Sequence, residues 1–391
     1  MITRLTSQGA ARIVVLFGVV SLLADFTYES ARGIIGPYLG MLGASAVAIS
    51  IVSGAGELVG YGVRLLSGRL ADATRNYWLF VWVGYTVNLL AVPLLALAGH
   101  WELAAALVIV ERLGKAVRTP ARDVLLAHAT AQIGHGKGFG IHEALDQIGA
   151  VVGPLVVAAM LNTTAGSYRS TLAFLLVPAL AALGVLGVLF VGNRGQEATS
   201  YRQQYALPTS SIPSHYRYFL FGVGFAAAGF ADFPLLAYHL HKQGVSDAGI
   251  PLLYALAMGA DAVAALVLGR LFDRWGIRIL ALSGVISAIS AILVVAGGIS
   301  AWMGIVAWGM GMGAHESILR ASVAFLVPPQ QQGTAFGLLS AWYGISWFVG
   351  SAVLGMLYQI DPFAMAYGAA LLQGIGVTLW LKLRPIEQKS E

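Results

Sequence analysis

The chain alternates between long apolar stretches and short polar turns. Each apolar stretch is close to the roughly 20 residues that a helix needs to cross the hydrocarbon of a bilayer. The runs are continuous rather than alternating, which favours helices over a β-barrel. The pattern predicts twelve transmembrane helices, over residues 13–38, 45–68, 77–98, 102–127, 138–161, 170–192, 217–241, 248–270, 277–297, 301–327, 333–357 and 361–383.

The longest polar stretch, residues 193–216, falls between the sixth and seventh predicted helices. Its glutamines, charges and two prolines are typical of a linker. We therefore expect a six-helix N-terminal half over residues 1–192, a cytoplasmic linker over 193–216 and a six-helix C-terminal half over 217–391.

Composition agrees with a membrane protein. Hydrophobic residues make up 58% of the 391 positions and charged residues 10%, and the mean hydropathy is +0.77. A soluble domain has about 25% charged residues, so this composition excludes a soluble enzyme or a nucleic-acid-binding protein. The pI of 9.4 reflects a net charge of only +5 along the whole chain. The absence of cysteine excludes disulfides and thiolate metal sites.

The positions of lysine and arginine predict the orientation. With both termini in the cytoplasm, fifteen of these residues belong to the inside segments, and only Arg169 and Lys242 belong to the outside segments. We expect a multi-pass protein of the cell (inner) membrane. The run from Ile13 to Ala24 also fits a signal-peptide core, but a matching segment recurs later in the chain, which favours a membrane helix.

Three fragments recur at nearly constant spacing. The second copies follow the first by 207, 201 and 197 residues, and the pairs are Ala24-Asp25-Phe26 with Ala231-Asp232-Phe233, Gly68-Arg69-Leu70-Ala71-Asp72 with Gly269-Arg270-Leu271-Phe272-Asp273, and Phe139-Gly140 with Phe336-Gly337. Two parallel repeats predict a pseudo-twofold axis along the membrane normal and a substrate site between the halves near mid-membrane.

These fragments carry a family resemblance that covers essentially the whole chain. The loops at 68–72 and 269–274 resemble the signature loop of the major facilitator superfamily, and residues 149–154 resemble the glycine–proline motif of its antiporters. Residues 112–123 and 138–146 look like those of a broad group of bacterial permeases. The sequence departs from the family at 73–76, which is less basic, and around Arg112, which lacks the full glycine-rich antiporter pattern. The resemblance implies a twelve-helix transporter that works by alternating access.

Two groups of residues have conformational roles under this resemblance. We expect a latch across the cytoplasmic face, formed by Gly68, Asp72, Gly269, Asp273 and Arg274. Capped helix ends with basic neighbours would explain the same residues. We also expect close helix approach and bending at Gly149, Gly153 and Pro154. Ordinary packing of small residues is the alternative there.

Half of the acidic residues lie inside predicted spans, nine of 18. A charged side chain at the bilayer centre costs roughly 2.5–3.5 kcal/mol on insertion scales, so these residues should face the protein interior and mark function. Asp25, Glu29 and Arg32 share one face of the first helix at positions i, i+4 and i+7. Glu111 and Arg112 lie in the fourth helix, which by resemblance lines the cavity with the first.

We hypothesise that Asp25 and Glu29 carry protons and that Arg32, Arg112 and Glu111 tune them. The proton affinity of a carboxylate depends on its burial and on nearby charge, so movement of an arginine can load or release a proton. A static ion-pair network that joins the helices is the alternative.

Other polar and aromatic residues are candidates for the cavity and the substrate contacts. They are Glu57, Tyr61, Lys115, Arg118, His142, Asp146, Asp232, His239, Asp261, Glu316, Trp342 and Tyr343. His142 and Asp146 have metal-ligand spacing, but no three ligands cluster locally, so we expect neither a metal nor another cofactor. The sequence contains no phosphate-binding glycine loop, so we do not expect transport to be driven by ATP hydrolysis.

Taken together, the residues and the resemblance predict a secondary transporter in the lipid bilayer that exports a small solute in exchange for protons and acts as a monomer. A proton symporter or a uniporter for an organic anion is the alternative, because Arg32, Arg112, Lys115 and Arg118 make the N-terminal half locally basic. An enzyme is not expected, because no nucleophile–base pair has recognisable spacing, and neither is a receptor.

Overall fold

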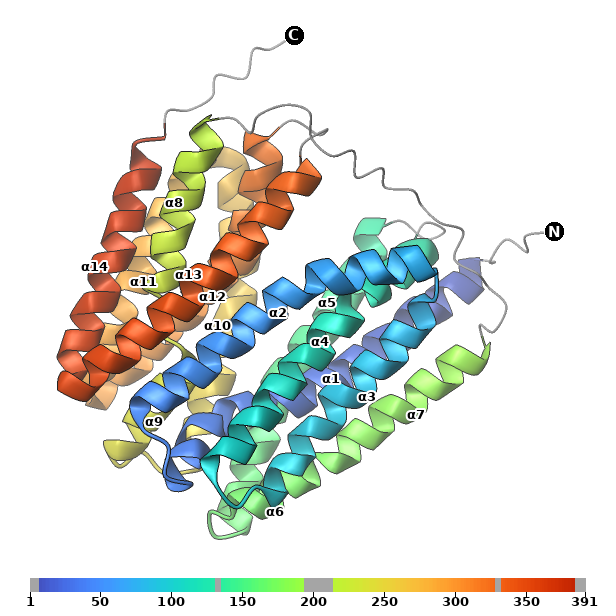
Figure 1. The fold of residues 1–391 in the computed structure, drawn as a ribbon, viewed down its shortest axis with the longest axis horizontal. Coiled ribbons are helices and arrows are strands. Elements are labelled where there is room, and N and C mark those ends of the chain that lie inside the picture. Colours follow the sequence, from blue (N-terminus) through green and yellow to red (C-terminus); the bar gives the residue numbers. More distant parts are fainter. Residues whose placement is uncertain (1–6, 131–134, 193–213, 328–331, 384–391) are drawn as a thin grey trace. The chain divides into compact units, whose positions relative to one another are not determined.

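The computed structural model of the protein describes residues 7–130, 135–192, 214–327 and 332–383. Within these ranges the chain is helical and contains no β-strand. Figure 1 shows the helices in chain order, and their bounds are α1 Ser7–Met41, α2 Ala46–Thr74, α3 Tyr77–Leu94, the 3₁₀ turn η1 Leu95–Leu97, α4 Trp101–Thr130, α5 His135–Thr163, α6 Tyr168–Phe174, α7 Leu176–Gly192, α8 Ser214–Ala228, α9 Phe233–Lys242, α10 Gly249–Trp275, α11 Arg278–Ala296, α12 Gly298–Leu326, α13 Gln332–Ile360 and α14 Pro362–Leu381.

Every predicted span coincides with one helix or with one consecutive pair. Two spans are interrupted: α6 and α7 are separated at Leu175, and α8 and α9 are separated by residues 229–232. In the described part of the chain, ten helical segments are long and apolar enough to cross a membrane. The segments α4 and α12 are not among them. The segment α4 carries seven charged residues.

Local sequence explains where the helices start and stop. The side chains of Asn76, Ser167 and Asp361 accept hydrogen bonds from backbone N–H groups in the first turns of α3, α6 and α14, as good N-cap residues do. Pro362 follows its cap at the first helical position. Between α11 and α12 the backbone turns at Gly297, whose φ of +77° favours glycine.

The chain forms two compact units, which are described separately. Unit 1 comprises residues 1–44, 59–202 and 246–255, and therefore includes the first residues of α10. In it α1 packs on α5 and α7, and α3 packs on α4. Its buried core includes Phe17, Tyr38 and Tyr85.

Unit 2 comprises residues 45–58, 203–245 and 256–391, and includes the first residues of α2. In it α11 packs on α12 and α14, and α8 packs on α13 and α14. Its buried core includes Trp308, Trp347 and Phe230.

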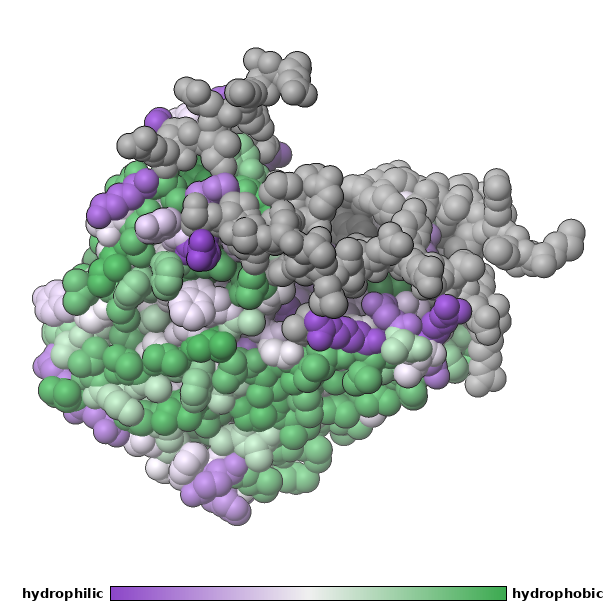
Figure 2. Space-filling view, turned by 45° about the horizontal axis from the view of Figure 1, so that its top comes forward, coloured by the Kyte–Doolittle hydropathy of each residue, from purple (hydrophilic) through white to green (hydrophobic). Residues whose placement is uncertain are grey.

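Large apolar side chains are exposed on the outer faces of many helices. Figure 2 shows apolar residues over most of the coloured part of the visible face, and Val177, Val188 and Leu371 are more than half exposed. Soluble monomers rarely expose apolar patches larger than a few hundred Å². These faces are therefore suited to contact with lipid tails.

Candidate functional site

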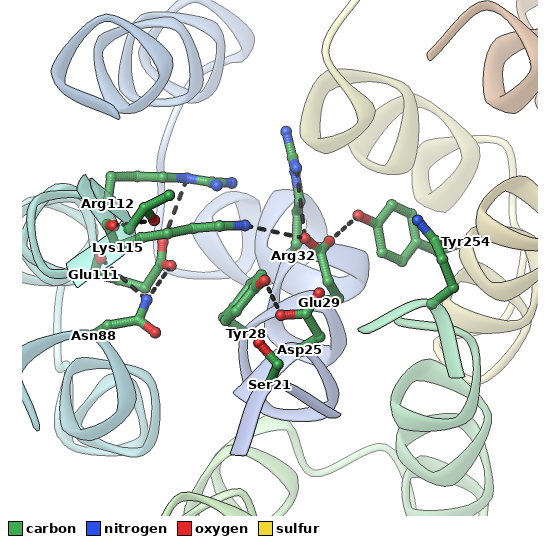
Figure 3. A network of polar contacts seen from close by, with 12 residues as sticks. Ser21, Asp25, Tyr28, Glu29, Arg32, Asn88, Glu111, Arg112, Lys115 and Tyr254 are labelled. Carbon is green, nitrogen blue, oxygen red and sulfur yellow. Dashed lines mark hydrogen bonds and ion pairs between the residues drawn. The ribbon is translucent and has the colours of Figure 1, made fainter. Parts of the chain in front are cut away.

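Unit 1 contains a network of buried charged and polar side chains from α1, α3, α4 and the start of α10. Figure 3 shows it: Asp25, Tyr28, Glu29 and Arg32 lie together on α1, and Lys115 of α4 extends toward Glu29. On the other side of Glu29 lies Tyr254 of α10. The helical spacing seen in the sequence places Asp25 and Glu29 one turn apart on the same face.

Glu29 is the most connected carboxylate of the network. Its Oε1 lies 3.8 Å from Nη1 of Arg32 and 3.9 Å from Nζ of Lys115. Its Oε2 accepts a hydrogen bond from the hydroxyl of Tyr254. The side chain of Glu29 is only 8% exposed, so two cations and a phenol from three helices compensate a buried charge, as buried charges require.

Asp25 has a different environment. Its Oδ1 accepts a hydrogen bond from the hydroxyl of Tyr28, three residues later. Nζ of Lys115 lies 3.9 Å from the centroid of the Tyr28 ring, within the range of a cation–π contact. Tyr28 therefore stands between the carboxylate on α1 and the cation on α4.

Glu111 and Arg112 form a second group on α4. Oε2 of Glu111 lies 3.4 Å from Nε of Arg112, and Oε1 accepts a hydrogen bond of 2.7 Å from Nδ2 of Asn88 on α3. Asn88 also donates to the backbone carbonyl of Glu111 at 3.2 Å. Arg112, expected to tune the α1 carboxylates, thus has an ion-pair partner on its own helix.

Arg118 lies on α4 three residues after Lys115 and is fully buried. Its guanidinium carbon is 4.2 Å from the centroid of the Tyr85 ring and 5.9 Å from that of Tyr28. Within the described chain, none of its three guanidinium nitrogens has a hydrogen-bond partner.

The network continues along α4 and α5. Arg122 donates to Oδ1 of Asp123 at 2.8 and 2.9 Å and to the hydroxyl of Ser21 at 3.4 Å. Ser21 is also 3.4 Å from Nε2 of His142, which lies 3.8 Å from Oδ2 of Asp146. His142 and Asp146 thus join the α1–α4 network.

The glycines of the predicted bend lie where α5 meets α1. A Cβ on Gly149 would lie 2.2 Å from the carbonyl oxygen of Leu22, and one on Gly153 would lie 2.5 Å from that of Phe26. Pro154 lies inside the continuous helix α5. The two helices can approach this closely because glycine has no side chain.

In unit 2, Asp232 stands at the break between α8 and α9. Its carboxylate accepts hydrogen bonds from Nε1 of Trp347, at 2.6 Å, and from the hydroxyl of Ser351. Nε1 of Trp308 donates to the carbonyl of Ala231 at 2.7 Å. These donors satisfy the buried groups that an interrupted helix leaves open.

The other candidates of unit 2 are spread over several helices. His239 and His315 are buried, and their Nδ1 atoms lie 2.9 Å from the hydroxyl of Tyr358 and 3.1 Å from that of Tyr343, respectively. Asp261 is buried, Glu316 is exposed, and Trp342 is 38% exposed with its ring edge-on to Phe221.

Glu57 and Tyr61 lie on α2, in unit 2 and unit 1 respectively, and Arg64 lies 5.4 Å from the centre of the Tyr61 ring.

Of the predicted latch, Asp72 accepts a hydrogen bond of 2.9 Å from Tyr77, and Gly68 faces Pro120 of α4. Gly269 and the exposed Arg274 lie in α10. Asp273 also belongs to α10, but its side chain lies outside the described part. The latch stays a prediction.

Sequence reasoning missed Tyr28, Tyr85, Asn88, Ser21 and Tyr254. The i, i+3 spacing of Asp25 and Tyr28 was a usable signal. Nothing local could have found Tyr254, which is 225 residues from Glu29. Across the described chain, no three His, Asp or Glu side chains are grouped as a metal site would need.

Comparison with known proteins assigns this arrangement of helices to a family. Residues 17–351 match the family described as Major Facilitator Superfamily. The chain belongs to the major facilitator superfamily. It is a multi-pass membrane protein with the fold of this family's transporters, and it transports a solute.

The sequence relatives carry no substrate in their names. An uncharacterised protein of Mycobacterium tuberculosis is 40% identical over 385 residues, which cover 96% of this chain and 93% of the relative. An uncharacterised transporter of the same superfamily from Methanocaldococcus jannaschii is 24% identical over 380 residues, covering 92% of each chain.

Solved structures show the same fold. A mutant of the nucleoside transporter NupG superposes with a TM-score of 0.79 at 13% identity, covering 95% of this chain and 98% of that one. A mutant of the peptide transporter POT gives a TM-score of 0.76 at 15% identity, covering 97% and 98%. At such identities the likeness concerns the fold alone.

Proposed function

We propose that this member of the superfamily is a proton-coupled secondary transporter of the inner membrane, with both termini in the cytoplasm, and that it exports a small solute in exchange for protons. Asp25 is the proton-carrying carboxylate, and Glu29 holds the neighbouring cations in position. The single observation that carries the proposal is the buried network in which these two groups differ in their partners.

The difference assigns distinct roles to the two carboxylates. Glu29 lies near two cations, Arg32 and Lys115, which favour its charged form. Asp25 has a neutral phenol as its hydrogen-bond donor, and within the described chain it forms no ion pair. Asp25 is therefore better placed to exchange a proton, and Glu29 to hold the cations of α1 and α4 in position.

Alternating access supplies the mechanism. Lys115 contacts the ring whose hydroxyl binds Asp25, so a shift of α4 along α1 changes the positive charge near Asp25. More positive charge there favours release of the proton, and less favours its uptake. Solute movement can be coupled to the proton gradient in this way.

A second candidate function is symport of an organic anion with a proton, or its uniport. It is favoured by Arg118, a buried guanidinium near Asp25 without a hydrogen-bonded counter-ion among the described residues. An anion held beside Asp25 would favour the protonated form of that carboxylate, so solute and proton would travel together.

Proton flux in reconstituted vesicles tests the proposal. Proteoliposomes loaded with the pH dye pyranine would be given tetraphenylphosphonium, ethidium, succinate, benzoate or glycerol 3-phosphate. We expect at least one solute to drive a pH change in the wild type. Acidification of the compartment that the solute leaves indicates antiport, and alkalinisation indicates symport.

Asp25→Asn removes the titratable group and should abolish the solute-driven pH change. Glu102→Gln is the matched control, since Glu102 is exposed in the first turn of α4, and it should behave as the wild type. Undiminished proton flux in Asp25→Asn would refute the assignment of the proton carrier.

A further inference from the structure

Four cations follow one another along α4, and three of them have a carboxylate nearby. Arg112 lies by Glu111 at 3.4 Å, Lys115 by Glu29 at 3.9 Å and Arg122 by Asp123 at 2.8 Å, while the fourth, Arg118, forms no such pair within the described residues. Arg118 is also the most buried of the four, with a relative exposure of 0%.

This environment is costly for a guanidinium. The group is always charged and carries five N–H donors, and a buried charge without hydrogen-bond acceptors costs several kcal/mol. The guanidinium carbon lies 4.2 Å from the centre of the Tyr85 ring and 5.9 Å from that of Tyr28. Stacking on aromatic rings compensates part of the charge but satisfies none of the donors.

Packing holds Arg118 in place. A Cβ on Gly84 of α3 would lie 2.6 Å from the Cβ and the backbone nitrogen of Arg118. The two helices therefore touch at this level, and the glycine makes the contact possible. The backbone of Arg118 is positioned before any ligand binds, which lowers the entropic cost of binding.

We propose that Arg118 binds the anionic group of the transported solute, a carboxylate or a phosphate. The inference rests on the transport function proposed above and deepens its organic-anion alternative, since it names the class of substrate for the same network. The planar fork of a guanidinium matches both anions, with two parallel N–H···O bonds. Among the described residues, no acceptor bonds to this fork.

Ligand-induced thermal stabilisation tests the proposal on the purified full-length chain in detergent. The probes are succinate and benzoate for carboxylates, glycerol 3-phosphate for phosphates, uridine as a neutral compound and tetraphenylphosphonium as a cation, all at equal ionic strength. A ligand that binds the folded state raises Tm in proportion to the logarithm of its concentration. We expect one anion class to raise Tm, and the class that does so identifies the group recognised.

Three variants separate binding from structure. Arg118→Gln should weaken the apparent affinity for that anion at least tenfold, Arg118→Lys should weaken it less, and Arg217→Gln should leave it unchanged because Arg217 is exposed on α8. Without ligand, Arg118→Gln should unfold at the same temperature as the wild type or higher, because it removes a buried charge whose N–H donors have no acceptor among the described residues. If Arg118 instead stabilised the fold, ligand-free Arg118→Gln would unfold at a lower temperature than the wild type.

The proposal is overturned if no anion stabilises the wild type, if Arg118→Gln responds to anions as the wild type does, or if ligand-free Arg118→Gln melts well below the wild type. Asp25→Asn should keep the anion-induced shift, since the anion contacts Arg118. If the vesicle assay shows no proton coupling but the anions still raise Tm through Arg118, only the proton assignment is overturned. If proton coupling is seen but the rise in Tm does not depend on Arg118, only the anion-binding proposal is overturned.

Discussion

The hydroxyl of Tyr28 donates a hydrogen bond to the carboxylate of Asp25, while the ammonium group of Lys115 lies 3.9 Å from the centre of the same ring. One aromatic side chain therefore connects the proposed proton carrier on α1 to the cations on α4. The connection needs both ends of tyrosine: the hydroxyl for Asp25 and the π face for Lys115.

Removing the hydroxyl of Tyr28 should weaken coupling without unfolding the protein. Tyr28→Phe keeps the ring and its contact with Lys115 but loses the bond to Asp25. A hydrogen bond to a charged group is worth about 1.5–3 kcal/mol, so we expect solute-driven proton flux to fall by about tenfold or more. Tyr238→Phe, on α9, is the control and should leave the flux unchanged. Equal rates in Tyr28→Phe and the wild type would exclude this role.

The bond between Tyr254 and Glu29 should show energetic coupling. We expect Tyr254→Phe to lower the unfolding free energy by about 1–2 kcal/mol and Glu29→Gln to lower it as well, because each leaves a partner of the network unsatisfied. In thermal unfolding of the double variant, the two losses should not add. Strict additivity would mean that the two side chains do not interact.

Asp232 should prove structural, although it occupies the repeat position of Asp25. Asp232→Asn retains an acceptor for Trp347 and should leave proton flux within about twofold of the wild type. Asp232→Ala leaves a buried indole N–H without its acceptor and should lower stability by about 1–3 kcal/mol. Loss of proton coupling in Asp232→Asn, with normal thermal stability, would instead place Asp232 in the transport mechanism.

At Gly149, where α5 contacts α1, no side chain should be tolerated. In Gly149→Ala the new methyl would meet the carbonyl oxygen of Leu22 at 2.2 Å, so we expect a loss of about 1–3 kcal/mol in stability from overpacking. Gly184→Ala is the matched control, because a Cβ at this exposed position in α7 meets no atom within 4 Å. It should stabilise the helix by up to about 1 kcal/mol. Similar melting temperatures for the two variants would contradict the close approach.

Helix positions were predictable to a large extent because lipid imposes a length and a polarity on every crossing segment. The interruption at residues 229–232 was not predicted, because the mostly apolar stretch 217–241 was interpreted as one span although Asp232 lies within it. At that break, Trp308, Trp347 and Ser351 donate hydrogen bonds from distant helices. The same Ala-Asp-Phe fragment stays within a continuous helix at Asp25.

Within the site, helical spacing correctly put Asp25 and Glu29 on one face. Helical spacing could not predict which partner each cation of α4 has, because these residues follow one another along the same helix. The structure separates them: Lys115 lies near Glu29 and Arg112 near Glu111, but Arg118 stacks on Tyr85 instead. Partner choice depends on which neighbouring helix faces each side chain.

The amino-acid sequence alone determined that this protein lies in a membrane, where its helices run and that half of its acidic residues fall within the predicted spans. These properties follow from hydrophobicity and helical periodicity, which act over a few turns of one helix. Only the tertiary structure decided that Tyr254 binds Glu29, that Tyr28 links Asp25 to Lys115 and that Arg118 is buried between tyrosines. Such contacts join residues up to 225 positions apart, and they depend on helix packing that no local pattern encodes.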